Sequence, residues 1–160
     1  MLRELAHRSK AHWPYSAAFL ETVRPMLQLD DDDVATHEVH VLERDGVVLG
    51  WHRITVHGEA AELEDLWLEP ALIGKGHGRE LFDHAATVAR GHGARVLEWD
   101  AEPFARGFYE AMGGVEVGRT PSAAAPGRTL PRMRLELVKL TRDAAEGQSS
   151  RTADGDPRTP

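Results

Sequence analysis

The chain has no cysteine, few aromatic residues and no long apolar run. Without cysteine it cannot form disulfide bonds, thiolate metal sites or a covalent acyl-cysteine intermediate. The N-terminal stretch MLRELAHRSKAHW lacks the apolar centre of a secretory signal peptide. No segment approaches the roughly 18 consecutive apolar residues of a membrane span. We therefore expect a cytoplasmic protein with no membrane partner.

Positive charge is also scarce, because 19 Lys and Arg residues face 26 Asp and Glu residues, for a formal net charge of −7. This balance argues against a general binder of nucleic acids, which needs a basic face. The 160 residues, 41% of them hydrophobic, suit one globular domain. Residues 141–160 hold only three alanines as apolar content. We expect a domain over residues 1–140 and a disordered C-terminal tail over 141–160.

Apolar periodicity and turn residues divide the chain into helices and strands. The expected helices are one with Leu2, Leu5, Ala6 and Ser9 on one face, one from Tyr15 to about Arg24, then His77–His92 and Pro103–Met112. The expected strands are Thr36–Glu43, Val47–Val56, Ala60–Leu68, Arg95–Asp100, Val115–Gly118 and a last one through Met133, Leu135 and Leu137. This order predicts an α/β fold with a mixed, mostly antiparallel twisted sheet, a central parallel βαβ unit and helices on both faces.

Two groups of residues raise the question of a metal. The run Asp30–Asp33 is expected to be a solvated loop, since the spacing and later glutamate of an EF-hand are missing. The nine histidines include no carboxylate–histidine motif, and pairs such as His37 and His40 differ in strand parity. We expect no metal.

The most informative segment follows the third expected strand, where three glycines alternate with basic residues just before a helix. They are Gly74, Gly76 and Gly78, interleaved with Lys75, His77 and Arg79. Glycines let backbone amides converge, and the first turn of a helix offers unpaired N–H donors with partial positive charge, so the segment suits a phosphate or diphosphate. Neither a P-loop nor a dinucleotide-binding fingerprint fits, because His77 follows Gly76 and the last fingerprint position is Arg79 or Leu81.

Three motifs in order resemble the GNAT superfamily of acyl-CoA-dependent N-acyltransferases, in particular its small single-domain bacterial members. The first is Leu68-Glu69-Pro70 followed by Ile73-Gly74-Lys75-Gly76-His77-Gly78, the second is Ala105-x-x-Phe108-Tyr109-Glu110-x-x-Gly113, and the third is His12-Trp13-Pro14-Tyr15 with Pro126-Gly127-Arg128-x-Leu130-Pro131. The resemblance spans roughly residues 2–140. Two positions depart from the family pattern: Ile73 stands where Arg or Gln is usual, and Glu102 replaces an Asn.

The resemblance implies acetyl-CoA as cosubstrate. The amides of Gly74, Lys75, Gly76, His77, Gly78 and Arg79 would then hold the diphosphate. A bulge would splay the preceding strand from the next parallel one, so that Leu66, Trp67 and Leu68 could pair with the pantetheine arm, with Phe108 also at the cofactor. The N–H of Leu68 would stabilise the oxyanion.

The resemblance also implies catalytic roles. Tyr109 would protonate the departing thiolate, and Glu62 or Glu64 would take the proton of the amine, directly or through water. Both glutamates share strand parity with Leu66 and Leu68 unless a bulge changes it. Trp13 and Tyr15 could line the acceptor pocket. Because relatives are commonly dimers, a homodimer is also possible.

We therefore expect an N-acetyltransferase that acts on a primary amine of a small molecule or peptide. A catalytically inactive acyl-CoA-binding or sensing module on the same fold is the alternative that the two departures favour. An unrelated nucleotide-binding or interaction domain is the third possibility, which the failed fingerprints disfavour. The acceptor itself cannot be named from the sequence, because a fold resemblance does not fix a substrate.

Overall fold

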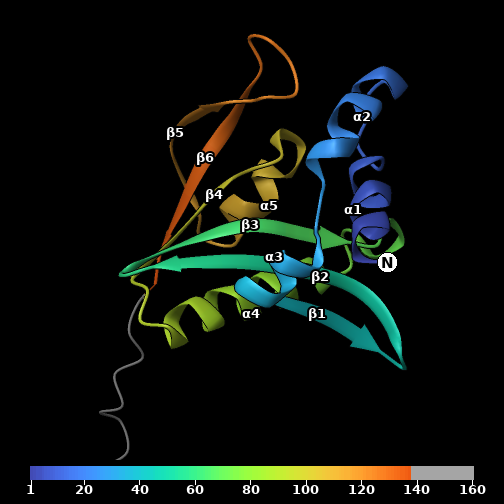
Figure 1. Ribbon diagram of the computed structural model, residues 1–160. Coiled ribbons are helices and arrows are strands. Elements are labelled where there is room, and N and C mark those ends of the chain that lie inside the picture. The colour runs from blue at the N-terminus through green and yellow to red at the C-terminus, as the bar shows by residue number, and fades with distance from the viewer. Residues whose placement is uncertain (138–160) are drawn as a thin grey trace, which may run out of the picture.

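A computed structural model describes residues 1–137, which form one six-stranded sheet in the order β1-β2-β3-β4-β6-β5 (Figure 1). The strands are β1 Glu38–Arg44, β2 Val47–His57, β3 Ala60–Leu68, β4 Val96–Asp100, β5 Val115–Pro121 and β6 Thr129–Glu136. β3 pairs with β4 in parallel, and every other neighbouring pair is antiparallel. The predicted mixed sheet is confirmed, whereas the expected tail at 141–160 lies outside the described residues.

Helices cover both faces of the sheet, as predicted. They are α1 Leu2–Lys10, α2 Ala17–Val23, α3 Asp31–Thr36, α4 His77–Gly91 and α5 Arg106–Ala111, with short 3-10 helices at Arg24–Met26, Pro70–Leu72 and Pro103–Ala105. α1 packs on one face, where Leu5 contacts the buried Trp51 of β2. α4 packs on the other, where Phe82 meets Ile54 of the same strand. No helix within residues 1–137 is long and apolar enough to cross a bilayer.

The main core lies between α4, α5 and the middle of the sheet. Three alanines of α4, Ala85, Ala86 and Ala89, are fully buried there, so the helix backbone comes close to the strands. Trp99 of β4 fills the other end of this core, and a Cβ on Gly114 would lie 2.9 Å from its ring. Glycine at position 114 therefore lets β5 begin beside the Trp99 ring.

The acidic run Asp30–Asp33 was predicted as a solvated loop, and this was wrong. It begins helix α3 through a capping box, in which Asp30 accepts from the Asp33 amide and Asp33 accepts from the Asp30 amide. Three acids in the first turn also suit the positive end of the helix. Asp33 further binds Arg53 at 2.8 Å, which ties α3 to the sheet.

Three histidine side chains from distant parts of the sequence lie together between β1, β2 and α4. The ring centroids of His40, His52 and His84 are 5.0–5.2 Å apart, and His52 Nε2 lies 2.9 Å from His84 Nδ1. His52 is fully buried, and its Nδ1 has no hydrogen-bond partner in the described part of the chain. Within residues 1–137 no group of three or more His, Cys, Asp or Glu is placed to hold a metal ion.

We expect this cluster to make the free energy of unfolding depend on pH. Burial, with smaller effects of His84 and His40, lowers the pKa of His52 to about 3, whereas a histidine in an unfolded chain titrates near 6.5. The stabilisation by neutral His52 is complete above pH 6.5 and is lost as the pH falls toward 3. We expect His52 to cost about 2 kcal/mol of the free energy of unfolding between pH 7 and pH 5.

Urea unfolding at pH 7 and pH 5 measures this loss, with His52→Gln as the non-titrating reference. The variant should lose about 2 kcal/mol less than the wild type over the same interval. Equal losses in the two proteins would show that His52 is not responsible for the pH dependence.

Candidate functional site

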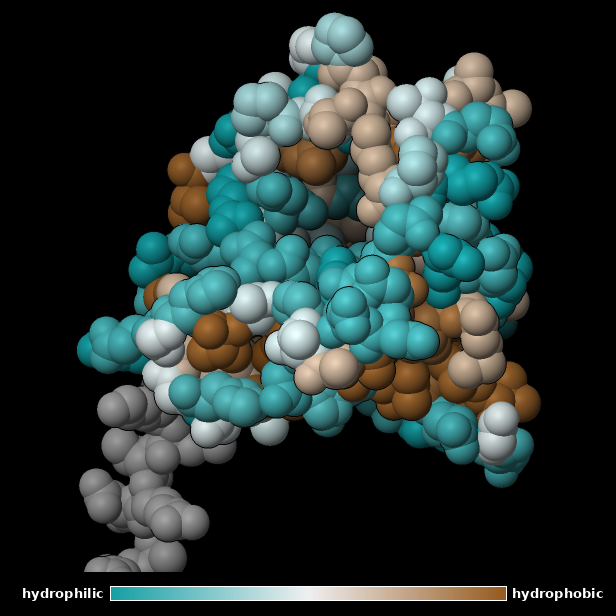
Figure 2. All heavy atoms as spheres, in the orientation of Figure 1, coloured by the Kyte–Doolittle hydropathy of each residue, from teal (hydrophilic) through white to brown (hydrophobic). Residues whose placement is uncertain are grey.

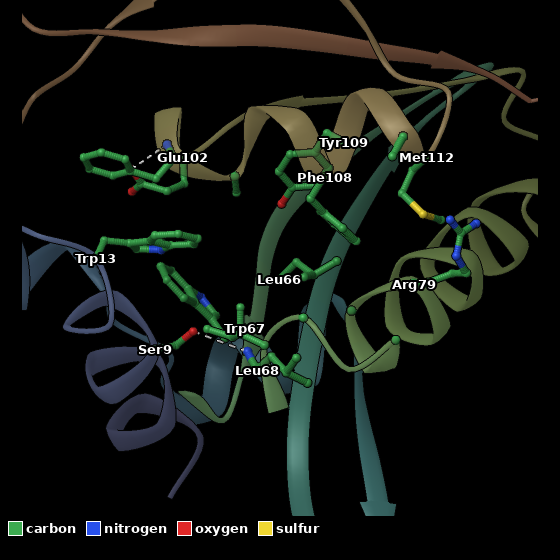
Figure 3. A pocket seen from close by; sticks show the side chains of 17 residues that line it. Ser9, Trp13, Leu66, Trp67, Leu68, Arg79, Glu102, Phe108, Tyr109 and Met112 are labelled. Carbon is green, nitrogen blue, oxygen red and sulfur yellow. Dashed lines mark hydrogen bonds between the residues drawn. The ribbon is translucent and has the colours of Figure 1, made fainter. Parts of the chain in front are cut away.

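Strands β3 and β4 separate partway along their length, and a cavity lies beside the unpaired end of β3 and the residues that follow β4. They pair only at Ala60↔Val96, Ala61↔Leu97 and Glu62↔Glu98, although β3 continues to Leu68. Figure 3 looks into this cavity of about 420 Å³. Its lining consists of Ser9, Trp13, Leu66, Trp67, Leu68, Ile73, Gly74, Gly76, Gly78, Arg79, Glu102, Phe104, Ala105, Phe108, Tyr109, Ala111 and Met112.

The glycine segment forms one end of this cavity. Gly74 and Gly76 have φ of 80° and 91°, in the left-handed region that favours glycine, and Gly76 is the N-cap of α4. The first turn of α4 therefore presents amides without intrahelical acceptors toward the cavity mouth. A Cβ on Gly78 would lie 3.3 Å from the Phe108 ring, so glycine also allows α4 and α5 to approach each other.

The basic residues of this segment are spread around the amides. Arg79 lines the cavity and extends toward Met112 (Figure 3), while Lys75 is exposed. His77 is half-buried, with Nδ1 3.7 Å from Glu80. The arrangement gives an exposed positive rim beside the unpaired amides, as an anion site requires.

Strand β3 carries the expected bulge, and its position changes which face Glu62 occupies. Arg53 of β2 pairs with Asp65 and the next residue Ile54 pairs with Leu63, so Glu64 is the extra residue. Glu62 therefore lies on the α1 face of the sheet. The bulge is the exception that the sequence analysis named: it reverses the alternation, so Glu62 does not share a face with Leu66 and Leu68.

Neither glutamate of β3 lines the cavity. Glu62 accepts hydrogen bonds from Arg132 at 2.5 and 2.6 Å, and Glu98 shares the same guanidinium at 3.0 Å. This network raises the pKa of Arg132, chiefly through the bond to Glu62. Glu64 is exposed on the bulge. Neither Glu62 nor Glu64 is therefore among the residues that line the cavity.

The end of β3 places one backbone donor in the cavity. The Leu68 amide points to the hydroxyl of Ser9 on α1, with N and Oγ 3.5 Å apart, a long contact that a better acceptor could replace (Figure 3). Leu66, Trp67 and Leu68 all line the cavity, while their pairing with a pantetheine arm stays a prediction.

Tyr109 lies on α5 across the cavity from β3, with its hydroxyl directed into the open space (Figure 3). It is only 8% exposed, and its ring packs on Phe82 and Trp99. Burial raises the pKa of Tyr109, and the nearby charges of Glu102 and Asp65 raise it further. The hydroxyl therefore stays protonated and can act as a proton donor.

A family model described as the acetyltransferase (GNAT) family matches residues 2–114 of the chain, which is more than half its length. The protein belongs to the GNAT family. Among curated proteins no sequence matches it. Several solved structures of GNAT proteins are similar to this one. Because their sequence identities to this chain are low, the similarity shows a shared fold and nothing further.

One such structure is a GCN5-related N-acetyltransferase from Rhodopseudomonas palustris, with a TM-score of 0.71, 20% identity, and coverage of 85% of this chain and 88% of the other. PaiA N-acetyltransferase from Thermoplasma acidophilum, in complex with coenzyme A, has a TM-score of 0.64, 18% identity, and coverage of 84% and 90%. IAA acetyltransferase from Bacillus cereus has a TM-score of 0.62, 18% identity, and coverage of 86% and 93%. Coenzyme A is thus the ligand of one protein with this GNAT fold.

The first departure of this GNAT chain from the family pattern has a packing explanation. Ile73 is partly buried against a small core of Leu42, Leu68 and Leu81 and also lines the cavity. It fixes the loop by apolar contact, in place of the hydrogen bonds that an Arg or Gln side chain offers. Arg79 is the cavity-lining cation that remains near the glycine loop.

The second departure, Glu102, is the one carboxylate among the cavity-lining residues of the described chain. Its side chain forms an ion pair with Lys10 of α1, accepts a hydrogen bond from the Tyr15 hydroxyl, and caps the Phe104 amide at 3.4 Å. Lys10 and Glu102 are 11% and 14% exposed. Sequence reasoning missed this cluster, because it considered Glu102 only as a missing Asn. An acid directly before Pro103 at a helix start was the available signal.

Proposed function

We propose that this GNAT protein is an acetyl-CoA-dependent N-acetyltransferase that transfers the acetyl group directly to a primary amine. The main support is that the splayed β3–β4 edge and the glycine segment before α4 open onto one cavity. A ligand with a diphosphate at one end and an extended amide-bearing arm needs these two features side by side.

In this proposal each part of acetyl-CoA contacts a different part of the cavity lining. The amides of residues 74–79, except that of Lys75, which donates to the Leu72 carbonyl, would bind the diphosphate, and the side chains of Lys75 and Arg79 would add positive charge. The free edge of Leu66–Leu68 would pair with the pantetheine amides, and Phe108 would close the opposite side.

The proposed chemistry uses the Leu68 amide, the Tyr109 hydroxyl and a carboxylate. The neutral amine attacks the thioester carbon, and the Leu68 amide stabilises the oxyanion in place of its long contact with Ser9. The carbon–sulfur bond then breaks, Tyr109 gives its proton to the thiolate, and the excess proton of the amine passes to a carboxylate.

Three carboxylates, Glu102, Glu62 and Glu64, are candidates to receive this proton. Glu102 is itself ion-paired with Lys10 and hydrogen-bonded by Tyr15, but of the three it is the one that lines the space into which Tyr109 points, so the cavity favours it. Glu62 is held by Arg132 and Glu64 lies on the exposed bulge, so either would act through water.

We expect Glu102→Gln to lower kcat/KM about 100-fold, as for loss of a general base. The three matched variants Glu102→Gln, Glu62→Gln and Glu64→Gln, assayed over a range of pH, should show this loss at Glu102, together with loss of the plateau in the pH profile. A larger loss of kcat/KM in Glu62→Gln or Glu64→Gln would identify that glutamate of β3 as the general base, as the sequence analysis expected.

Two assays test the proposed activity. Acetyl-CoA should raise the melting temperature of the protein, whereas ATP and NAD should not. Free thiol released from acetyl-CoA in the presence of a panel of amines reports turnover. If acetyl-CoA binds but no amine is acetylated, the inactive acyl-CoA-binding module is favoured. Ile73 and Glu102, which depart from the family pattern, are the residues that support this alternative.

A further inference from the structure

Arg128, in the loop between β5 and β6, lacks a carboxylate partner within residues 1–137. Its guanidinium donates instead to two neutral hydroxyls, that of Tyr15 at 2.7 Å and that of Ser122 at 2.9 Å. Arg119 of the same hairpin, by contrast, binds Glu116 at 3.0 Å. A half-buried guanidinium with spare N–H donors is suited to bind a carboxylate from outside the protein.

The position of Arg128 is fixed although it has no counter-ion in the described part of the chain. Its guanidinium carbon lies 5.5 Å from the centroid of the Tyr15 ring and 5.0 Å from that of Phe19. These rings, together with the two hydroxyls, hold the cation in place before any ligand arrives. A preorganised cation loses little entropy on binding an anion, which favours recognition.

Arg128 and Glu102 are neighbours of opposite charge, because the Tyr15 hydroxyl is hydrogen-bonded to both. Glu102 lines the cavity, and Arg128, which is not itself a lining residue, is joined to Glu102 through the Tyr15 hydroxyl. The two charged groups are therefore separated by a single hydroxyl group. An α-amino acid likewise carries an ammonium and a carboxylate on one carbon atom.

The surroundings are open to solvent on one side and apolar on the other. Figure 1 places the β5–β6 loop and the α1–α2 segment on the same side of the molecule, and Figure 2 shows a hollow between them. Trp13 and Phe104 stack at 5.8 Å with an interplanar angle of 14°, and both line the cavity. Phe104 is 51% exposed. These rings could accommodate an apolar side chain.

We propose that the acceptor is an α-amino acid with an apolar side chain, whose carboxylate binds Arg128 and whose amino group lies at Glu102. This inference rests on the proposed acetyltransferase function and narrows its acceptor. Glu102 holds the amino group beside the thioester, and after the neutral nitrogen has attacked, Glu102 receives its excess proton. Arg128 selects the substrate and does not take part in proton transfer.

The test compares L-phenylalanine with L-phenylalaninamide, which differs in having a neutral carboxamide. Thiol release should give a kcat/KM at least about tenfold higher for the acid, as expected for one charge-assisted contact. At the same pH this ratio should fall about tenfold in Arg128→Gln relative to the wild type, whereas the control Arg119→Gln should keep the wild-type ratio. Calorimetry with acetyl-CoA verifies that the Arg128 variant still folds and binds the cosubstrate.

Each outcome decides between the two claims. The amino-acid site is refuted if the enzyme acetylates amines without preferring the free acid, or if Arg128→Gln keeps that preference. In both cases the proposed acetyltransferase activity is still supported. If no amine turns over, calorimetry of L-phenylalanine with the protein–CoA complex separates the remaining cases. Binding that Arg128→Gln weakens about tenfold supports the site without the activity, and absence of binding refutes both.

Discussion

Replacing Gly76 with aspartate is expected to weaken acetyl-CoA binding at least about 100-fold, roughly 3 kcal/mol. Gly76 is the N-cap of α4 and has φ of 91°, and no other part of the protein lies within 4 Å of the place that a Cβ would occupy. An aspartate there has room for its carboxylate, which competes for the amides of the first turn and repels the diphosphate. Isothermal titration calorimetry measures the change in Kd.

Gly58 supplies the matched control. It also has a positive φ, 61°, with open space around it, but it lies in the turn between β2 and β3. Gly58→Asp therefore adds the same charge and a similar backbone strain at a distance from the glycine segment. Both variants should lose some stability, and only Gly76→Asp should lose affinity. Equal affinities in the two variants would show that the amides near Gly76 do not hold the diphosphate.

Replacing Tyr109 with phenylalanine should lower kcat about 100-fold while changing the Kd of acetyl-CoA less than about threefold. The ring is buried against Phe82 and Trp99, so phenylalanine keeps the packing and removes only the hydroxyl. Since burial raises the pKa of Tyr109, the wild-type hydroxyl remains a proton donor throughout the neutral and mildly alkaline range.

Steady-state thiol release and calorimetry on the same preparation separate these two effects. A variant with wild-type kcat would remove Tyr109 from the reaction. A variant with weakened acetyl-CoA binding and unchanged kcat would instead assign the hydroxyl to cofactor binding.

The strands, the glycine segment and the helix after it could be predicted because each depends on local pattern. Apolar alternation in Ala60–Leu68 predicted the strand with its observed ends, and the glycines before His77 marked the start of α4. The Asp30 capping box was also local, and it was missed because the acids were considered as charges and not as N-terminal helix caps.

The rest depends on contacts between distant residues. The bulge at Glu64 exists only in relation to the partner strand, where Arg53 pairs with Asp65, so periodicity along β3 could not reveal the change of face. The cluster of Glu102, Tyr15 and Arg128 joins three separate parts of the chain. No local sequence pattern predicts that these three residues are in contact, because they come together only in the folded structure.

The central claim is that backbone amides within residues 74–79 bind the diphosphate of coenzyme A. Amide chemical shifts of a ¹⁵N-labelled protein, followed during titration with CoA and separately with acetyl-pantetheine, test it most directly. CoA should move the Gly74, Gly76 and Gly78 signals strongly, and acetyl-pantetheine, which lacks the diphosphate, should move chiefly those of Leu66–Leu68. Glycine signals that stay in place at saturating CoA would contradict the account.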